Sequence, residues 1–306
     1  MSIVDFHVHF GVAGMKLTES YEDVYGKEKW DLVQRMNEEQ RARWRQAWRF
    51  PIPDAPLEDY HDTARLWLKE MDENDISHMV FVTAGNNEIA ADIQKIAPNR
   101  FVCFAHHDIC EPDAAEQLEH AITDLGLRGY KLLGPALSKP LDDKSLEPVW
   151  KVAEKHRIPI LIHFGILGGA GGTAKHVNMS PMIIHDVAKA HPEIPFVVPH
   201  FGCGEVRDTL FLCWACPNVH IDTSGSNQWT RWMPYSLTVK DLYRKYYETI
   251  GPKRILFGTD SGWFPRGFVK QYFDSQMRDC VEIGMKNEDI DLIFSENAKR
   301  LLKIKD

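Results

Sequence analysis

The sequence Asp5-Phe6-His7-Val8-His9 decides the fold expected for this chain, because two histidines stand two positions apart inside the apolar run from Ile3 to Phe10. Alternate side chains of a β-strand point to the same side, so His7 and His9 would share one face. Two imidazoles at that spacing can bind one metal ion. The alternative is a half-buried strand whose histidines are only hydrogen-bonded, and sequence features further along the chain distinguish the two.

Seven more short, β-rich runs follow along the chain, each bounded by turn residues. The eight predicted strands are 3–9, 77–83, 101–106, 127–133, 158–163, 194–200, 218–223 and 254–260. Several are apolar almost throughout, which is typical of strands buried on both faces of a parallel sheet. The spacing of apolar residues predicts helices over 60–74, 112–125, 142–156, from 180, 204–215, 238–250, 267–284, 287–294 and 295–302.

Strands that alternate with helices over 306 residues predict an α/β fold, the (β/α)8 TIM barrel, in one domain that spans residues 1–306. The alternative, an open doubly wound sheet, lacks support because no Gly-x-Gly-x-x-Gly follows an early strand. An insertion of about residues 11–59 separates the first strand from its helix and is far longer than usual. We expect residues 27–49 to be helical and to form either a cap over the barrel or a subunit contact, or else a solvated helical hairpin.

Composition excludes several classes of protein. The chain has 36 Lys and Arg against 44 Asp and Glu, a net charge of −8, which argues against nucleic-acid binding. It contains neither an apolar run of about 18 residues nor the basic start of a secretory signal, so we expect a cytoplasmic protein without a membrane partner. The six cysteines are scattered like reduced thiols, and we interpret Cys213 and Cys216, despite their redox-motif spacing, as core residues.

Polar side chains recur where the predicted strands end. Strand one carries His7 and His9, strands five and six end with His163 and His200, and strand eight ends with Asp260. In a (β/α)8 barrel the C-terminal ends of the strands converge on one site. Several imidazoles and one carboxylate suit Zn²⁺, and also Mn²⁺, Fe²⁺ or Co²⁺. Further polar residues at strand ends are His106, His107, Lys131, Asp222, Thr223 and Ser224.

The stretches that carry these residues resemble the amidohydrolase superfamily of metal-dependent barrel enzymes, in particular its amidohydrolase-related (amidohydrolase 2) subgroup of hydrolases and non-oxidative decarboxylases. The resemblance implies that His7, His9, His163 and Asp260 hold one divalent metal, Zn²⁺ first and Mn²⁺ as the alternative. It also implies a homodimer. It covers nearly the whole chain and is carried by Val4–His9, Arg128–Lys131, Ile160–His163, Val198–Gly202, Leu256–Asp260 and Glu296–Leu302.

The same resemblance suggests roles for three residues. His200 is either a catalytic acid/base or a ligand of a second metal. Lys131 matches a position that is carboxylated and bridges two metals in some members; alternatively it is an uncarboxylated lysine that holds a substrate anion or an internal ion pair. A metal with an open position lowers the pKa of its bound water toward about 7. Asp260 could then take the proton from that water, and His200 could stabilise or protonate the developing oxyanion.

The loops after the strands supply candidates for substrate binding. Arg231 lies beside Trp229 and Trp232, and Trp263 is close to Arg266. An arginine next to an aromatic ring suits a planar, anionic small molecule through stacking and bidentate pairing; the alternative is a loop packed on the rim with its arginine in solvent. His176, in the glycine-rich loop after strand five, is either a substrate contact or part of a plain loop.

Three functions remain open. Our first prediction is a metal-dependent hydrolase of a small C–N or C–O substrate, such as a cyclic amide, lactone or ester. The second is a non-oxidative decarboxylase of an aromatic or unsaturated carboxylic acid, and the third is a non-enzymatic binding barrel. The decarboxylases that the chain resembles often place an aromatic residue and a proline directly after the aspartate, whereas Ser261 and Gly262 follow Asp260 here. That departure favours hydrolysis, while the long insertion favours decarboxylation.

Overall fold

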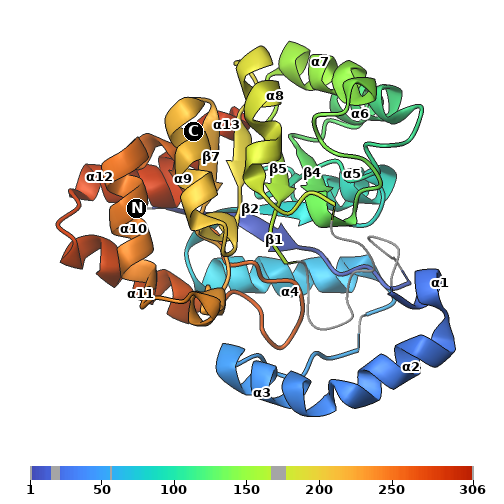
Figure 1. The fold of residues 1–306 in the computed structure, drawn as a ribbon, viewed down its shortest axis with the longest axis horizontal. Coiled ribbons are helices and arrows are strands. Elements are labelled where there is room, and N and C mark those ends of the chain that lie inside the picture. Colours follow the sequence, from blue (N-terminus) through green and yellow to red (C-terminus); the bar gives the residue numbers. More distant parts are fainter. Residues whose placement is uncertain (1, 15–20, 56, 167–176, 305–306) are drawn as a thin grey trace.

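The computed structural model describes residues 2–14, 21–55, 57–166 and 177–304. In these ranges eight parallel strands alternate with helices (Figure 1). The strands are β1 (Ile3–His9), β2 (Ile76–Thr83), β3 (Phe101–Cys103), β4 (Tyr130–Leu133), β5 (Ile160–His163), β6 (Phe196–Val198), β7 (Val219–Asp222) and β8 (Ile255–Leu256).

The insertion between β1 and α4 (Tyr60–Glu73) contains α1 (Tyr21–Tyr25), α2 (Lys27–Met36) and α3 (Glu38–Trp48), which confirms the expected helices in 27–49. These three helices lie along one side of the barrel; in Figure 1, α2 and α3 lie below α4 and α1 lies to its right. The other helices are α5 (Asn87–Ile96), α6 (Ala114–Thr123), α7 (Glu147–His156), α8 (His185–Ala190), α9 (Val206–Ala215), α10 (Val239–Ile250), α11 (Lys270–Glu282), α12 (Asn287–Asp291) and α13 (Asn297–Leu302).

The strands form two parallel ladders, β1-β2-β3 and β4-β5-β6-β7-β8. An isolated bridge joins the ladders at each seam, Val8 with Ser261 and Ala105 with Tyr130. Backbone hydrogen bonds reinforce the first seam, where the Asp260 N–H donates to the His7 carbonyl at 2.8 Å. The predicted (β/α)8 architecture is confirmed, although its strands do not make one continuous ladder.

Several element boundaries differ from the sequence prediction. β8 ends at Leu256 instead of Asp260, because the chain after it leaves β7 and bonds to β1 instead. Helix α5, capped by the side chain of Asn86, was not predicted. Ser295 does not begin a new helix: α12 continues through a π-helical turn, Leu292–Glu296, into α13.

Apolar side chains form two cores. The inner core gathers residues from strands all around the barrel, and Ala298 and Leu302 of α13 close its N-terminal end. The outer core lies between the strands and the surrounding helices, and it includes Cys213 and Cys216, the latter with its thiol toward the His185 carbonyl. The strand members of the inner core are Val4, Phe6, Val80, Val82, Val102, Leu161, Val197 and Leu256, and Phe104 directly after β3 joins them.

A buried carboxyl group ties β1 to the segment after β8. Asp5 is completely buried and accepts hydrogen bonds from the backbone N–H of Thr259, at 2.9 Å, and from the Thr259 hydroxyl. Burial raises the pKa of Asp5 to about 7. Gly258 permits the approach of the two segments, since a Cβ there would lie 2.9 Å from the Cβ of His7.

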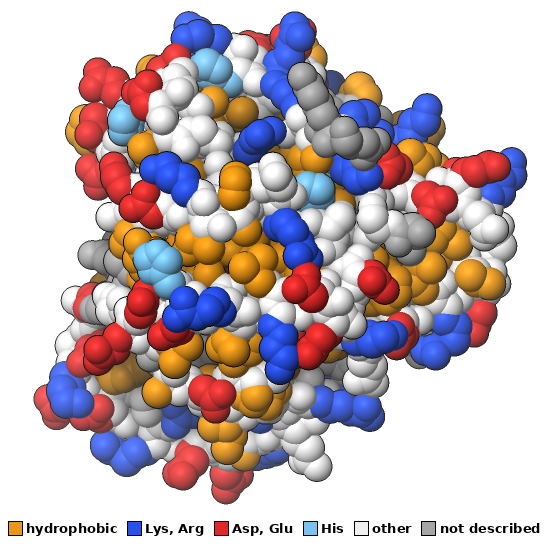
Figure 2. Space-filling view, turned by 180° about the vertical axis from the view of Figure 1, so that it is seen from behind, with side chains coloured by type: hydrophobic (Ala, Val, Ile, Leu, Met, Phe, Trp, Pro, Cys, Tyr) orange, Lys and Arg blue, Asp and Glu red, His pale blue; other side chains and the backbone are white. Residues whose placement is uncertain are grey.

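The outer surface carries charges of both signs. On the face shown in Figure 2, Lys and Arg side chains lie among Asp and Glu, with apolar side chains between them. None of the helices in the described ranges has the length and apolar character needed to cross a membrane.

We expect Thr259→Val to lower the free energy of unfolding by about 1–3 kcal/mol, because valine has a similar shape but leaves a buried oxygen of Asp5 with one donor fewer. The measurement is the shift of the urea midpoint with the slope unchanged. Thr123→Val is the control: Thr123 is exposed on α6 and bonds within its own helix, so its effect should stay within about 0.5 kcal/mol. Equal midpoints for Thr259→Val and the wild type would show that this bond does not stabilise the seam.

Candidate active site

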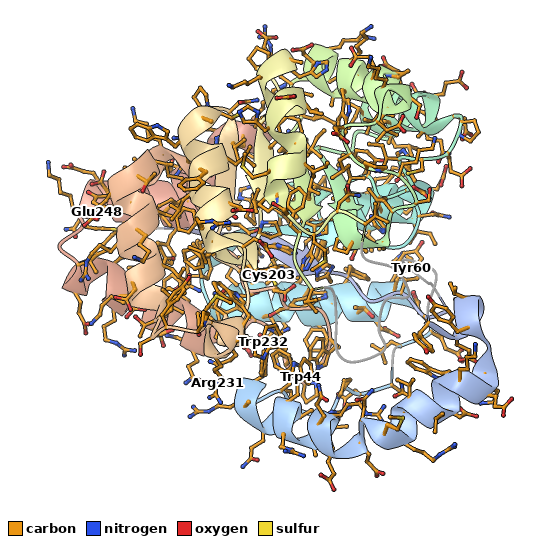
Figure 3. All side chains as sticks on the ribbon, in the orientation of Figure 1. Trp44, Tyr60, Cys203, Arg231, Trp232 and Glu248 are labelled. Atoms are coloured by element: carbon orange, nitrogen blue, oxygen red, sulfur yellow. The ribbon has the colours of Figure 1, made fainter. Side chains whose placement is uncertain are left out.

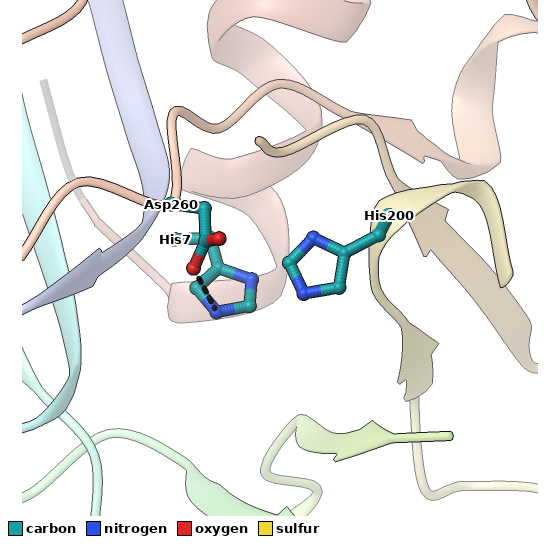
Figure 4. Close-up of side chains that lie close together, drawn as sticks. All are labelled: His7, His200 and Asp260. Carbon is teal, nitrogen blue, oxygen red and sulfur yellow. Dashed lines mark ion pairs between the residues drawn. The ribbon is translucent and has the colours of Figure 1, made fainter. Parts of the chain in front are cut away.

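The polar residues predicted at strand ends lie at the C-terminal end of the barrel, as parallel strands require. Ligand atoms of His7, His200 and Asp260 all lie within 4.8 Å of one another (Figure 4). His7 comes from β1, while His200 and Asp260 stand two and four residues beyond the ends of β6 and β8. Three separate strands therefore supply one compact His-His-Asp cluster.

Asp222, at the end of β7, orients the imidazole of His7. The Asp222 carboxylate accepts a hydrogen bond from His7 Nδ1 at 2.8 Å, and both side chains are completely buried. Because a carboxylate accepts this bond, the proton is assigned to Nδ1 and the lone pair to Nε2. His7 Nε2 is buried and has no hydrogen-bond partner among the described residues. It lies 3.8 Å from Asp260 Oδ1, which is the arrangement of a histidine ready to coordinate a metal.

The backbone at His200 and Asp260 directs both side chains into the cluster. Each residue has a positive φ, 56° for His200 and 55° for Asp260, a conformation that non-glycine residues adopt at a cost of about 1–2 kcal/mol. His200 Nδ1 lies 3.1 Å from the Ser224 carbonyl oxygen, which can only accept a hydrogen bond. Nδ1 is thus assigned the proton, and Nε2 remains the ring atom that can exchange a proton or bind a metal.

Ser224 and Asp222 connect the two histidines. The Ser224 hydroxyl lies 3.1 Å from His7 Nδ1 and 2.9 Å from His200 Nδ1, and it donates to the carboxylate of Asp222. Asp222 also accepts from the backbone N–H of His200 at 3.1 Å. One buried carboxylate and one hydroxyl therefore set the orientation of both rings.

The environment of His7 favours a neutral imidazole beside ionised carboxylates. Burial lowers the pKa of His7 to about 3, even though Asp222 acts in the opposite direction. Burial alone would raise the pKa of Asp222 and of Asp260. The attraction of neighbouring histidines outweighs burial and holds both carboxyl pKa values below their usual range. His7 makes the largest such contribution for Asp222, and His200 makes the largest for Asp260.

The cluster fits a divalent metal. It provides neutral imidazole nitrogens and an ionised carboxylate, the donor types that Zn²⁺ and Mn²⁺ accept. The orphaned Nε2 of His7 is a second indication, because a buried polar atom without a partner is costly unless a ligand satisfies it. The carboxylate behind His7 supplies the outer contact that metal-binding histidines usually have.

The structure brings the other predicted ligands close to the cluster in different ways. His9 Nε2 lies 3.2 Å from Asp260 Oδ1, and its Nδ1 lies 2.7 Å from the Thr83 hydroxyl. The ring of His163 is centred 5.1 Å from that of His200, but its Nε2 lies 3.1 Å from the Ile166 carbonyl oxygen. His9 is thus placed to join the cluster, whereas His163 makes a backbone contact at its edge.

Lys131, predicted as a bridging or substrate-binding residue, lies on β4 and is 1% exposed. Burial lowers the pKa of Lys131 to about 8, and the negative charges of Asp222 and Asp260 limit the shift. The lysine is thus buried inside the barrel and is absent from the described lining of both cavities.

Two cavities that share lining residues open beside the cluster. The first has aromatic walls and reaches Asp260, His163 and His200. The second reaches Asp260 and His9 and includes Trp263 and Arg266. Both are bounded by Trp44 and Phe50, so the insertion covers the cluster. The aromatic residues of the first cavity are Trp44, Trp48, Phe50, Trp229 and Trp232.

Two predicted substrate contacts, Arg231 and His176, are not among the described residues that line the cavities. Arg231 is exposed, donates to the Gln228 side chain at 2.7 Å and is absent from the described lining of both cavities. In Figure 3 it lies near Trp44 and Trp232, which occupy the space between α3 and the barrel. His176 lies outside the described residues.

Sequence reasoning gave no role to Asp222 or Ser224, although both stand at a strand end. The available signal was the aspartate that ends β7, Val219–Asp222. Only the packing of β7 between β6 and β8 shows that its carboxylate reaches His7 and His200.

We expect Asp222→Asn to weaken divalent-metal binding about 10- to 100-fold, because asparagine can hold His7 in the wrong tautomer and removes a charge. Competition titration with a chromophoric chelator measures this affinity. Asp186→Asn, at a highly exposed carboxylate on α8, is the matched control and should bind metal like the wild type. Unchanged affinity in Asp222→Asn would rule out its role behind a metal ligand.

The chain is similar to several known proteins. It is 25% identical to a gamma-resorcylate decarboxylase of Rhizobium radiobacter over 271 residues, which is 71% of this chain and 75% of that protein. Its structure resembles that of an uncharacterized TIM-barrel protein from Bordetella bronchiseptica, with a TM-score of 0.67, 22% identity and 99% of each chain covered.

A second structural neighbour is a probable 2-pyrone-4,6-dicarboxylic acid hydrolase from Acinetobacter baumannii with citric acid bound. Its TM-score is 0.63 at 14% identity, with 99% of this chain and 100% of that chain covered, so the likeness concerns the fold. The sequence model of the amidohydrolase family matches residues 4–304, nearly the whole chain. This chain, with its His-His-Asp cluster at the C-terminal end of a (β/α)8 barrel, belongs to the amidohydrolase family.

Proposed function

We propose that this protein is a metal-dependent decarboxylase of a planar, aromatic or unsaturated carboxylic acid. One observation carries the proposal: a cavity walled by tryptophan and phenylalanine side chains ends on Asp260 and His200. Such walls suit a flat ring, and they exclude water from a carboxylate that is to lose CO2. The similarity to a gamma-resorcylate decarboxylase supports the same reaction.

We assign the metal to His7, His9, His163 and Asp260, with His200 as the neighbouring imidazole. Zn²⁺ is the preferred ion and Mn²⁺ the alternative. When bound, the metal supplies positive charge that attracts and polarises an anionic oxygen of the substrate. Lys131, buried beneath, adds to the positive potential of the site.

The residues of the chain would perform the proton transfer. Decarboxylation breaks the bond between the ring carbon and the carboxylate and places a proton on that carbon. His200 Nε2 is the group that can deliver this proton, since Ser224 occupies Nδ1. Asp260, whose ligand atom lies within 4.8 Å of that of His200, would stabilise the protonated imidazole.

Hydrolysis is the second candidate, and a specific feature supports it. Asp260 is ionised beside the metal cluster and 32% exposed, so it could take a proton from water that enters the cavity. His200 would then face the oxyanion of a lactone, ester or cyclic amide. A structural neighbour named as a probable hydrolase agrees with this reaction on the same fold.

One experiment separates the two reactions. The protein is purified without added metal, its metal content is measured by plasma mass spectrometry, and it is incubated in H₂¹⁸O with hydroxybenzoates, unsaturated acids, lactones and cyclic amides. Released inorganic carbon that matches substrate loss is the expected result. Uptake of ¹⁸O into a product acid without carbon release would replace the proposal by hydrolysis. Neither reaction in a metal-loaded protein would overturn both.

We expect Asp260→Asn to lower turnover by about 100-fold or more while the protein stays folded, because the amide cannot stabilise the imidazolium or accept a proton. Steady-state kinetics and circular dichroism test this together. Wild-type rates in Asp260→Asn would exclude the residue from catalysis.

We expect His163→Ala to lose metal to the same extent as His7→Ala, since the sequence pattern assigns both as ligands. Metal content after dialysis measures the loss. His185→Ala is the control, because His185 lies on α8 and pairs with Asp186 away from the site. Full metal content in His163→Ala would show that His163 is not a metal ligand and makes only its contact to the Ile166 carbonyl.

A further inference from the structure

The insertion and the loops after β7 and β8 are joined by a continuous row of aromatic side chains. Trp48 packs on Trp232 at 5.5 Å between ring centroids and stacks on Trp44 at 5.6 Å. Trp44 contacts Phe50 at 5.1 Å, and Phe50 meets Trp263 edge-on at 5.4 Å. We call these five residues, Trp232, Trp48, Trp44, Phe50 and Trp263, the aromatic band.

Arg266 stands at the end of the aromatic band. Its guanidinium carbon lies 4.5 Å from the centre of the Phe50 ring and 4.8 Å from that of Trp263. One terminal nitrogen donates to the Asp260 carbonyl at 2.6 Å and the other to the Thr259 carbonyl at 3.3 Å. Aromatic rings thus cover the flat faces of the guanidinium, and its edge is turned toward the backbone at Asp260.

This orientation differs from that of an arginine that clamps a substrate. A substrate carboxylate would need the two outward nitrogens as a free fork, and here that fork already holds two backbone carbonyls. Arg266 also borders the second cavity, and its Nε is buried without a partner in the described ranges, but both terminal nitrogens are turned to the backbone. The geometry points to support of the aspartate rather than to contact with substrate.

Asp260 needs such support. Its φ of 55° is a conformation that favours glycine. The His7 carbonyl holds the Asp260 N–H at 2.8 Å on one side, and Arg266 holds the Asp260 carbonyl on the other. With both peptide groups fixed, Oδ1 stays 3.2 Å from His9 Nε2 and within reach of His7.

We propose that Arg266 is a positioning residue that fixes Asp260 in the metal cluster, and that Phe50 of the insertion holds Arg266 in place for this task. The insertion thereby acts on the geometry of the cluster as well as on the shape of the cavity. This inference rests on the proposed function, because it takes Asp260 as both a metal ligand and a catalytic group.

The test uses Arg266→Lys, which keeps the charge but lacks the planar fork, and Phe50→Leu, which keeps apolar contact but lacks the ring. Arg43→Lys is the matched control, an exposed arginine on α3 of the insertion that pairs with Glu39. Each variant is titrated with Co²⁺ alone, and its visible absorption spectrum and dissociation constant are recorded. We expect a changed spectrum and about 10-fold weaker binding in Arg266→Lys, a smaller change in the same direction in Phe50→Leu, and no change in the control.

Steady-state kinetics then separate positioning from substrate binding. A positioning residue predicts a fall in kcat of about 10-fold or more, with KM within about 2-fold of the wild type. The double variant should lose less than the product of the two single losses, since Phe50 acts through Arg266. A raised KM with an unchanged Co²⁺ spectrum would overturn the proposal and make Arg266 a substrate clamp.

The Co²⁺ measurement needs no substrate. If no carboxylic acid is turned over, the proposed function fails while the spectrum still reports on Arg266. If Arg266→Lys does not fold, as judged by circular dichroism, Phe50→Leu alone decides: an unaltered spectrum and affinity in that variant would overturn the coupling.

Discussion

The hydrogen bond between His7 and Asp222 is the interaction on which the site depends. It joins β1 to β7 inside the barrel, away from water, where an unpaired carboxylate would be costly. Its direction determines which nitrogen of His7 faces the cluster. Asp222 also accepts the backbone N–H of His200, so the same carboxylate positions a candidate ligand and a candidate proton donor.

The seam between β1 and the chain after β8 places the third member of the cluster. Asp5 holds Thr259 from one side, and the His7 carbonyl holds Asp260 directly after it. β8 is short because the chain after Leu256 no longer pairs with β7 and forms backbone hydrogen bonds with β1 instead. The irregular segment after β8 carries Asp260, whose N–H donates to the His7 carbonyl and whose φ is 55°, so the irregularity of the barrel is part of the site.

The insertion gives the cluster its apolar surroundings. Trp44 and Phe50 border both cavities, and the aromatic band runs from the loop after β7 to the loop after β8. Aromatic walls above a charged floor lower the local dielectric and strengthen interactions between the charged groups there. A flat, anionic substrate would thus meet stacking surfaces at the entrance and positive charge at the base.

The sequence by itself determined the architecture and most of the cluster. Apolar runs that end on His7, His9, His163, His200 and Asp260 are visible without coordinates, because buried parallel strands are continuous in sequence and their C-terminal ends meet at one face. The aromatic residues of the insertion could be identified, but not their partners. Tertiary structure alone decided that Asp222 orients His7, that His163 Nε2 turns to a backbone carbonyl, that Arg231 stays at the surface and that Arg266 binds the backbone of Asp260. Each of these depends on which side-chain atom faces which neighbour across strands far apart in the chain, and periodicity along the sequence carries no information about that.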